Sequence, residues 1–136
     1  MGEAGDRAKS ARALVEKINR AWLEKRPEDL SAFFHPSVAM ALPGFVVYSE
    51  GSASMVRGFE EFTESCTVES HSFTDWHVHA ADDTAVVSFH FEMVYERDGK
   101  RFQSTGRDLW VVSLSGPSPK AVWRTLIDLT DSPVEP

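Results

Sequence analysis

The segment FHFEMVYERDGKRFQSTGRDLWVVSL, residues 89–114, decides the fold expected for this chain. Apolar residues recur at every second position on both sides of ERDGK, which has the composition of a turn. Successive side chains of a strand point to opposite faces of its sheet, so this alternation indicates strands. The segment therefore predicts two long strands joined as a hairpin.

The two strands of this hairpin each present one face to the core. On the first strand the inward set is Ala85, Val87, Phe89, Phe91, Met93 and Tyr95. On the second strand it is Phe102, Ser104, Gly106, Asp108, Trp110 and Val112. The outer face then carries, among others, His90, Glu92, Arg107, Leu109 and Val111.

Two further turn signals, AADDT and SGPSPK, divide the rest of the C-terminal half into successive hairpins. The expected strands are 73–80, 84–96, 101–115 and 121–130. On the last strand we expect Thr125, Ile127 and Leu129 to face inward. This leaves Asp128 on the outer face, where it can pair with Arg107.

Helical spacing dominates the N-terminal half. Asp6 is a plausible N-cap for an amphipathic helix that ends before Pro27, with an apolar stripe of Ala11, Leu14, Val15, Ile18 and Trp22. RPEDLSAFFHP predicts a short second helix closed by Pro36, and a third helix is expected to begin near Gly58 or a few residues earlier. SVAMALPG between them fits a short strand followed by a turn.

Helices followed by a meander of strands are typical of the α+β class, in which helices cover one face of an antiparallel sheet. The 136 residues, 42% of them hydrophobic, are enough for one domain with its own core. We therefore expect a single domain over 1–136, with mobile ends at about 1–6 and 131–136.

The net charge of −7 argues against nucleic acid and anionic membranes as partners, because both favour a basic surface. The single cysteine, Cys66, has no internal disulfide partner, and the charged N-terminus has no apolar run of the signal-peptide type. These features favour a soluble cytoplasmic protein. Neutral or cationic small molecules, or another protein, are the expected partners.

Asp108 falls on the apolar face of its strand, beside Trp110. An ionised carboxylate in such surroundings either has a hydrogen-bond donor or becomes protonated with a raised pKa. A protonated acid in an apolar pocket can donate a hydrogen bond to a developing oxyanion. Both interpretations are open, and a one-residue bulge would instead turn Asp108 outward and bring Arg107 in.

The order of elements, with FHFEMVYERDG followed by STGRDLWVVSL, resembles the NTF2-like superfamily, which includes the SnoaL-like domains and the ketosteroid isomerases. The resemblance covers nearly the whole chain and implies a cone-shaped fold with helices packed into a curved sheet. It also implies an apolar pocket inside the cone. Dimerisation through the outer face of the sheet is a further implication of the resemblance.

Residue by residue, the resemblance to the isomerases places Asp108 at the oxyanion acid and Phe89, Phe91 and Met93 on the pocket wall. Met40 or a neighbour stands where the isomerases have their general base. The isomerases' helix tyrosine falls near Lys17 or Ile18. Without either group the steroid isomerase reaction has no proton shuttle, so that reaction is not predicted.

Two related patterns are also incomplete. The limonene epoxide hydrolases need an arginine and two aspartates inside the pocket, whereas Arg107 and Asp128 are expected on the outer face. WRTLIDLTD resembles the ending W-R-x-x-H-x-H-x-S of small SnoaL-like domains, with Ile127 and Leu129 at the histidine positions. The pocket floor is therefore expected to be more apolar.

His77 and His79 in WHVH share one face of a strand, a spacing that can bind zinc if further ligands converge. An exposed polar sheet surface is the simpler interpretation, so no metal and no cofactor are predicted.

The sequence predicts a protein that binds a small hydrophobic molecule, with Asp108 as the oxyanion-type acid of an altered isomerase, lyase or cyclase. The ligand-binding residues predicted are Trp22, Met40, Phe59, Phe89, Phe91, Met93, Trp110, Ile127 and Leu129. The alternative is a non-catalytic homodimerisation module whose cone interior is a filled core.

Overall fold

The structure is a computed structural model, and it describes residues 2–134. Its elements in chain order are α1 (Gly2–Leu23), η1 (Pro27–Phe33), β1 (Phe34–Leu42), β2 (Val46–Glu50), α2 (Ser52–Ser65), β3 (Thr67–Ala81), β4 (Thr84–Arg97), β5 (Lys100–Ser113) and β6 (Lys120–Pro133). η1 is a 3-10 helix, and the other two helices are α-helices. The predicted order of helices and meander strands is confirmed.

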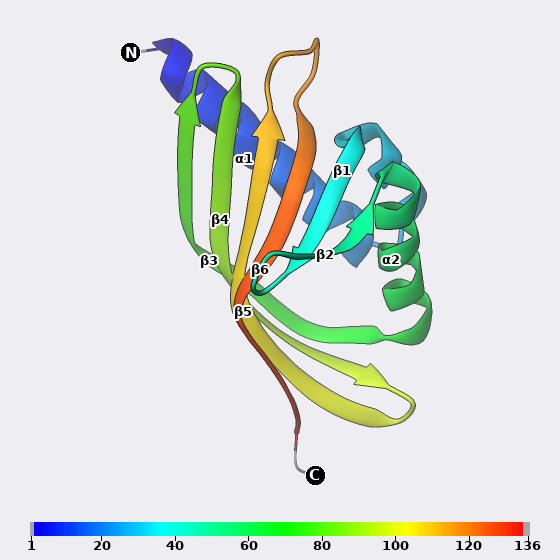
Figure 1. The fold of residues 1–136 in the computed structure, drawn as a ribbon. Helices are drawn as coiled ribbons and strands as arrows, with labels where there is room; N and C mark the ends of the chain where they lie inside the picture. The colour runs from blue at the N-terminus through cyan, green and yellow to red at the C-terminus, as the bar shows by residue number, and fades with distance from the viewer. Residues whose placement is uncertain (1, 135–136) are drawn as a thin grey trace.

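The strands form one six-stranded sheet in the order β2-β1-β6-β5-β4-β3. Every neighbouring pair is antiparallel except β1 and β6, which are parallel. Figure 1 shows that the sheet is curved and that α1 and α2 lie in its concavity. The predicted α+β cone is therefore confirmed, with one parallel pair that the sequence analysis did not predict.

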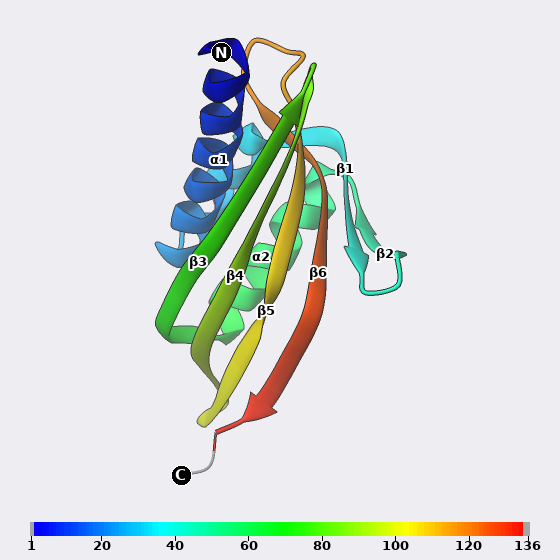
Figure 2. The ribbon, with the colours of Figure 1, turned by 90° about the vertical axis from the view of Figure 1, so that its left-hand side faces the viewer.

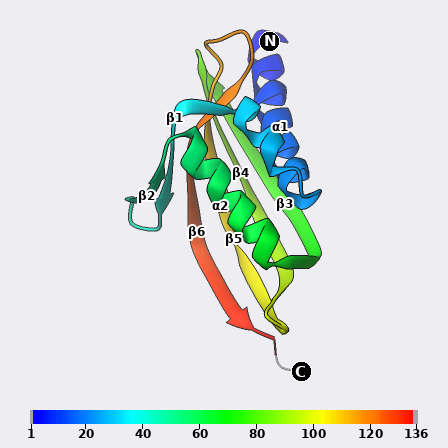
Figure 3. The same cartoon turned by 90° about the vertical axis from the view of Figure 1, so that its right-hand side faces the viewer.

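The two faces of the sheet have different surroundings. Figure 3 shows α2 lying across β4, β5 and β6 on the concave side. Figure 2 shows the outer face of β3 to β6, which none of the described helices covers. A ligand enclosed between helices and sheet must therefore lie on the concave side.

The core is built from the apolar stripe of α1 and the inward faces of β4 and β5. Its fully buried side chains include Val15, Ile18, Leu30, Val38, Val87, Phe89, Trp110 and Val112. The β4–β5 register is unbroken and pairs Phe89 with Asp108. The alternation predicted for both strands is thus confirmed, and no bulge turns Asp108 outward.

Several boundaries differ from the sequence analysis. The second helix ends at Phe33, and Pro36 lies within β1 rather than closing a helix. Pro36 lacks an N–H group, and the register between β1 and β6 shifts between Phe34 and Ala39, the stretch that contains it. α2 begins at Ser52, β3 begins at Thr67, and β2 was not predicted.

The chain ends belong partly to these elements. Residues 2–6 lie in α1 and residues 131–133 lie in β6. Residues 1 and 135–136, also expected to be mobile, lie outside the described residues. No described helix is long and apolar enough to cross a membrane.

Candidate functional site

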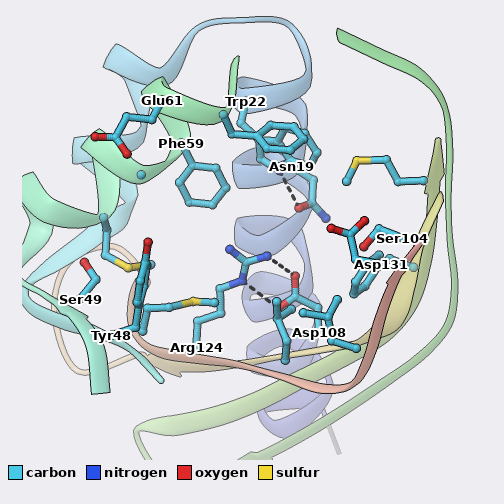
Figure 4. A pocket seen from close by; sticks show the side chains of 18 of the residues that line it. Asn19, Trp22, Tyr48, Ser49, Phe59, Glu61, Ser104, Asp108, Arg124 and Asp131 are labelled. Carbon is cyan, nitrogen blue, oxygen red and sulfur yellow. Dashed lines mark hydrogen bonds and ion pairs between the residues drawn. The ribbon is translucent and has the colours of Figure 1, made fainter. Parts of the chain in front are cut away.

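A cavity of about 630 Å³ lies between α1, α2 and the concave face of the sheet (Figure 4). This volume is in the range of about 300–1,000 Å³ that is common for small-molecule pockets. Its apolar lining comprises Trp22, Met40, Met55, Phe59, Phe62, Phe73, Phe91, Met93, Leu126 and Leu129. The cone interior therefore contains a cavity beside α2, next to the packed core.

An ion pair between Asp108 and Arg124 lies in the wall of this cavity. Arg124 donates from Nε to Oδ1 at 2.9 Å and from Nη2 to Oδ2 at 2.7 Å. The side chain of Asp108 is 4% exposed and that of Arg124 is 17% exposed. Asp108 thus has a charged donor, which is one of the two alternatives that the sequence left open.

Two aromatic rings lie within cation–π distance of the guanidinium of Arg124. Its Cζ atom lies 4.8 Å from the ring centroid of Trp110 and 5.3 Å from that of Phe59. The faces of aromatic rings attract cations, and this attraction is stronger away from water. Nε and Nη2 bond Asp108, whereas Nη1 has no hydrogen-bond partner among residues 2–134.

The inward position of Arg124 corrects the prediction for the last strand. The β5–β6 register shifts between Val111 and Val112, so Trp110 pairs with Arg124 and Asp108 pairs with Leu126. Arg124 and Leu126 therefore face the cavity. Ile127 is opposite Arg107 on the outer side and is 39% exposed, so its predicted inward position was wrong.

A second irregularity in β6 brings Leu129 back to the cavity. The register shifts again between Thr105 and Arg107, and Asp128 has a φ of 54°. Two residues of β6 therefore face one residue of β5, which is the pattern of a β-bulge. Leu129 lines the cavity as predicted.

Arg107 lies on the outer face as predicted, but its partner is not Asp128. Its Nη2 donates to Oδ2 of Asp75, and its Nη1 donates to Ser88 Oγ at 3.2 Å. Asp75 has a φ of 53° at a register shift of β3, which places its carboxylate beside the guanidinium. The bulges of β3 and β6 together decide this pairing.

Most of the predicted ligand-binding residues come together around the cavity. Those that line it are Trp22, Met40, Phe59, Phe91, Met93 and Leu129. Phe89 and Trp110 are 1% and 0% exposed and belong to the core beneath the wall.

Asn19 is a polar residue of the cavity that the sequence analysis missed. It lies on α1, is 4% exposed, and accepts a hydrogen bond of 3.2 Å from Trp22 Nε1. Its spacing could have revealed it, because Asn19 lies four residues after Val15 and three before Trp22 and so shares their face of the helix. An asparagine thus interrupts the apolar stripe that the same helix turns toward the core.

Tyr95 and Asp131 form a second polar pair in the lining. Tyr95 Oη donates to both carboxylate oxygens of Asp131, each at 2.9 Å. Burial of the phenol and this carboxylate raise the pKa of Tyr95 to about 12. The pair joins β4 to β6 across the strand between them.

The paired histidines of β3 do not form a metal centre. His77 Nε2 lies 3.0 Å from Asp75 Oδ1. Within the part of the chain that the structure describes, no group of three or more His, Cys, Asp or Glu side chains is placed to hold a metal ion.

The family follows from comparison with known proteins. The family model for the SnoaL-like domain matches residues 15–115, from the second half of α1 to the end of β5. This chain belongs to the SnoaL-like family. No curated protein matches it significantly.

Solved structures of the NTF2-like type share the fold of this SnoaL-like protein. A ketosteroid isomerase-like protein from Erwinia carotovora atroseptica aligns with a TM-score of 0.72 and 14% identity over 95% of this chain and 97% of its own. An NTF2-like protein from Cytophaga hutchinsonii has a TM-score of 0.69 and 17% identity, with coverages of 85% and 92%. The beta subunit of a benzoate 1,2-dioxygenase from Burkholderia mallei aligns with a TM-score of 0.69 and 18% identity over 88% of this chain and 87% of its own. At these identities the similarity shows the fold alone.

Proposed function

We propose that this SnoaL-like protein binds a small, mostly apolar molecule in the cavity between α1, α2 and the sheet. The observation that carries the proposal is a cavity in which aromatic and aliphatic side chains surround a buried ion pair, Asp108 with Arg124. Ligand pockets are commonly apolar with a few polar groups that fix orientation. The apolar body of the ligand would contact the aromatic wall, and its polar group would meet the pair.

Arg124, rather than Asp108, is the group of the pair that can meet a ligand oxygen. Both carboxylate oxygens of Asp108 already accept hydrogen bonds from Arg124. This pairing leaves Nη1 of Arg124 free to donate. A cation held in place away from bulk water stabilises negative charge that develops on an oxygen. An isomerase, lyase or cyclase reaction in this cavity would thus use Arg124 for the oxyanion, with Asp108 holding its orientation.

A titration with the neutral fluorophore N-phenylnaphthylamine tests the proposal. Gly58 lines the cavity on α2, and a Cβ atom added there meets no atom within 4 Å. Gly58→Phe should therefore start its side chain in open space and direct a ring toward the cavity. If the ring prevents about two methylene groups' worth of the fluorophore from being buried, the affinity for the fluorophore should fall about 10-fold.

Glu64→Phe is the matched control, because it adds the same ring to an exposed position of α2 that does not line the cavity. It should leave the affinity unchanged. The proposal is wrong if the wild-type protein does not bind the fluorophore. It is also wrong if Gly58→Phe and Glu64→Phe bind it equally well.

A further inference from the structure

A cluster of polar groups lines the cavity where β4, β5 and β6 lie side by side. Asp131 on β6 pairs directly with Ser104 on β5. Tyr95 on β4 donates to both carboxylate oxygens of Asp131, each at 2.9 Å. Figure 4 shows Ser104 and Asp131 next to each other on one side of the cavity. A bound molecule can therefore contact this cluster.

The carboxylate of Asp131 keeps unused hydrogen-bonding capacity. An ionised carboxylate has about four acceptor positions, whereas the hydroxyl of Tyr95 supplies a single proton. None of the ion pairs among residues 2–134 includes Asp131. Its side chain is also exposed rather than buried. Asp131 can therefore accept a hydrogen bond from a ligand while it keeps its bond to Tyr95.

Ser104 is a second polar group of the cluster that a ligand can satisfy. It is 6% exposed and lines the cavity. Tyr95 bonds Asp131, and no side-chain hydrogen bond among residues 2–134 includes Ser104 Oγ. Buried polar groups normally have a partner, and a hydroxyl both donates and accepts. A ligand hydroxyl that donates to Asp131 can thus accept from Ser104 in return.

The charges around the cluster favour a neutral donor. Arg97 also lines the cavity, and its Cζ atom lies 5.6 Å from the ring centroid of Tyr95. A ligand ammonium group that paired with Asp131 would face this guanidinium, and a ligand carboxylate would face Asp131 itself. Like charges held close together disfavour both arrangements. A neutral hydroxyl avoids both repulsions.

The cluster lies apart from the ion pair of Asp108 with Arg124. Ser104 and Asp108 share one face of β5 and are four residues apart, which is about 13 Å along an extended strand. Phe91 pairs with Gly106 between them and lines the cavity. The cavity thus has a donor at Arg124, an acceptor at Asp131 and an apolar wall between the two.

We propose that Asp131 and Ser104 form a second polar subsite, which binds a hydroxyl group at the end of the ligand opposite its oxygen acceptor. This inference rests on the proposed function, because it concerns the same cavity. It narrows the ligand class to elongated, neutral and mostly apolar molecules with an oxygen acceptor at one end and a hydroxyl at the other.

Three methyl naphthyl ketones test the proposal by isothermal titration calorimetry. They carry a hydroxyl, a methoxy or a methyl group on the ring carbon farthest from the ketone, and at neutral pH the phenol is protonated. The wild-type protein should bind the hydroxyl compound about 10-fold more tightly than the methyl compound, as one hydrogen bond to a charged acceptor allows. The methoxy compound should show no such gain, because its oxygen has no proton to donate.

Asp131→Asn keeps the size of the side chain but replaces the ionised acceptor by a neutral one. Hydrogen bonds between neutral groups are about half as strong, so the preference for the hydroxyl compound should fall to about 3-fold or less. Asp128→Asn is the matched control, because it removes the same charge from the same strand at a position that does not line the cavity. Asparagine also adopts the positive φ of 54° found there. This control should keep the full preference.

A direct readout on the wild-type protein does not depend on how the variants fold. In a carbon-detected NMR spectrum, the side-chain carboxyl carbon of Asp131 should shift with the hydroxyl compound and not with the methyl compound. Ser104→Ala should lower the affinity for the hydroxyl compound and leave the affinity for the methyl compound unchanged.

The outcomes separate this inference from the function on which it rests. If the wild-type protein binds none of the three ketones, the proposed function fails and the inference fails with it. If it binds all three equally, the cavity binds apolar molecules and only the hydroxyl subsite is overturned. A preference that persists in Asp131→Asn, or that Asp128→Asn lowers to the same extent, also overturns the subsite. So does an Asp131 carboxyl signal that does not move.

Discussion

Arg124 and Asp108 lie on neighbouring strands whose inner faces are otherwise largely apolar. Removing two charges from water is costly, and only good geometry and further interactions offset that cost. Here the pair is bidentate, and the guanidinium also lies near the rings of Trp110 and Phe59. Removing either partner would consequently leave the other charge buried and unpaired, which destabilises the folded state.

Arg124→Met should lower the free energy of unfolding by about 3 kcal/mol, because it leaves the carboxylate of Asp108 buried without a cation. Urea denaturation at neutral pH measures this loss. The double variant Asp108→Leu with Arg124→Met should recover most of it, because neither charge of the pair is then left buried and unpaired.

Arg107→Met provides the control, since the same substitution breaks an ion pair in which the side chain of Asp75 is 60% exposed. Solvent-exposed pairs contribute about 1 kcal/mol or less, so the loss should be small. Equal losses in the free energy of unfolding for Arg107→Met and Arg124→Met would contradict the expectation that burial makes the Asp108–Arg124 pair more costly to break.

Tyr95 gives the protein a pH dependence in the alkaline range. Burial and the Asp131 carboxylate raise the pKa of Tyr95 to about 12, against about 10 for a free tyrosine. A folded pKa above the unfolded one means that the contribution to stability is complete below about pH 10. It is then lost as the pH rises through the folded pKa of about 12.

The stability of the wild-type protein relative to Tyr95→Phe should therefore decrease across this alkaline window. The absorbance of tyrosinate measures the titration directly, and Tyr48→Phe leaves Tyr95 as the sole tyrosine of the chain. Ionisation of Tyr95 at the ordinary tyrosine pKa in this variant would argue against the Asp131 contact.

At the scale of the elements, irregularities in the strands decide which side chains reach the cavity. The β5–β6 register shifts between Val111 and Val112 of β5, and this turns Arg124 of β6 inward. The bulge at Asp128 returns Leu129 to the same face. Gly106 lies opposite this bulge. A Cβ atom there would lie 3.1 Å from the carbonyl oxygen of Ile127 and 3.2 Å from Leu129 Cα.

Two glycine-to-alanine substitutions should therefore have opposite effects on thermal unfolding. Gly106→Ala forces the backbone of the bulge to move and should destabilise the protein by about 1–3 kcal/mol. Gly58→Ala lies within α2 with open space around its Cβ position and should stabilise it by about 0.5–1 kcal/mol. An unchanged thermal stability in Gly106→Ala would mean that β5 and β6 are less tightly packed at the bulge.

At the scale of the whole molecule, no helix among residues 2–134 covers the outer face of the sheet (Figure 2). The homodimer expected from the sequence remains a prediction. Leu109 and Val111 are partly exposed on this face. Leu109→Glu should convert a dimer to a monomer, because it places a charge in the contact. Light scattering coupled to size-exclusion chromatography measures the mass of the species.

Val47→Glu is the control, since it adds the same charge to β2, where Val47 is 51% exposed. It should leave the dimer intact. A monomeric wild-type protein would contradict the prediction. Dissociation by Val47→Glu alone would place the contact at the β1–β2 hairpin instead.

The sequence by itself determined the α+β class, the meander and the inward faces of β4 and β5, because these strands keep a strict period of two. It also predicted that Asp108 faces inward, and the unbroken β4–β5 ladder of the structure confirms this. The family resemblance followed from the same two strands. Such patterns are local, so they can be read without knowing what packs against them.

Only the tertiary structure decided the partner of Asp108, the facing of β6 and the position of Asn19 beside the cavity. A bulge shifts the alternation by one residue, and its position depends on how neighbouring strands pair rather than on a local period. Arg124 is 16 residues from Asp108 in the chain, and Asn19 borders the cavity only because α1 packs against the sheet. The fold class is thus encoded locally, whereas the chemistry of the site depends on contacts between distant segments.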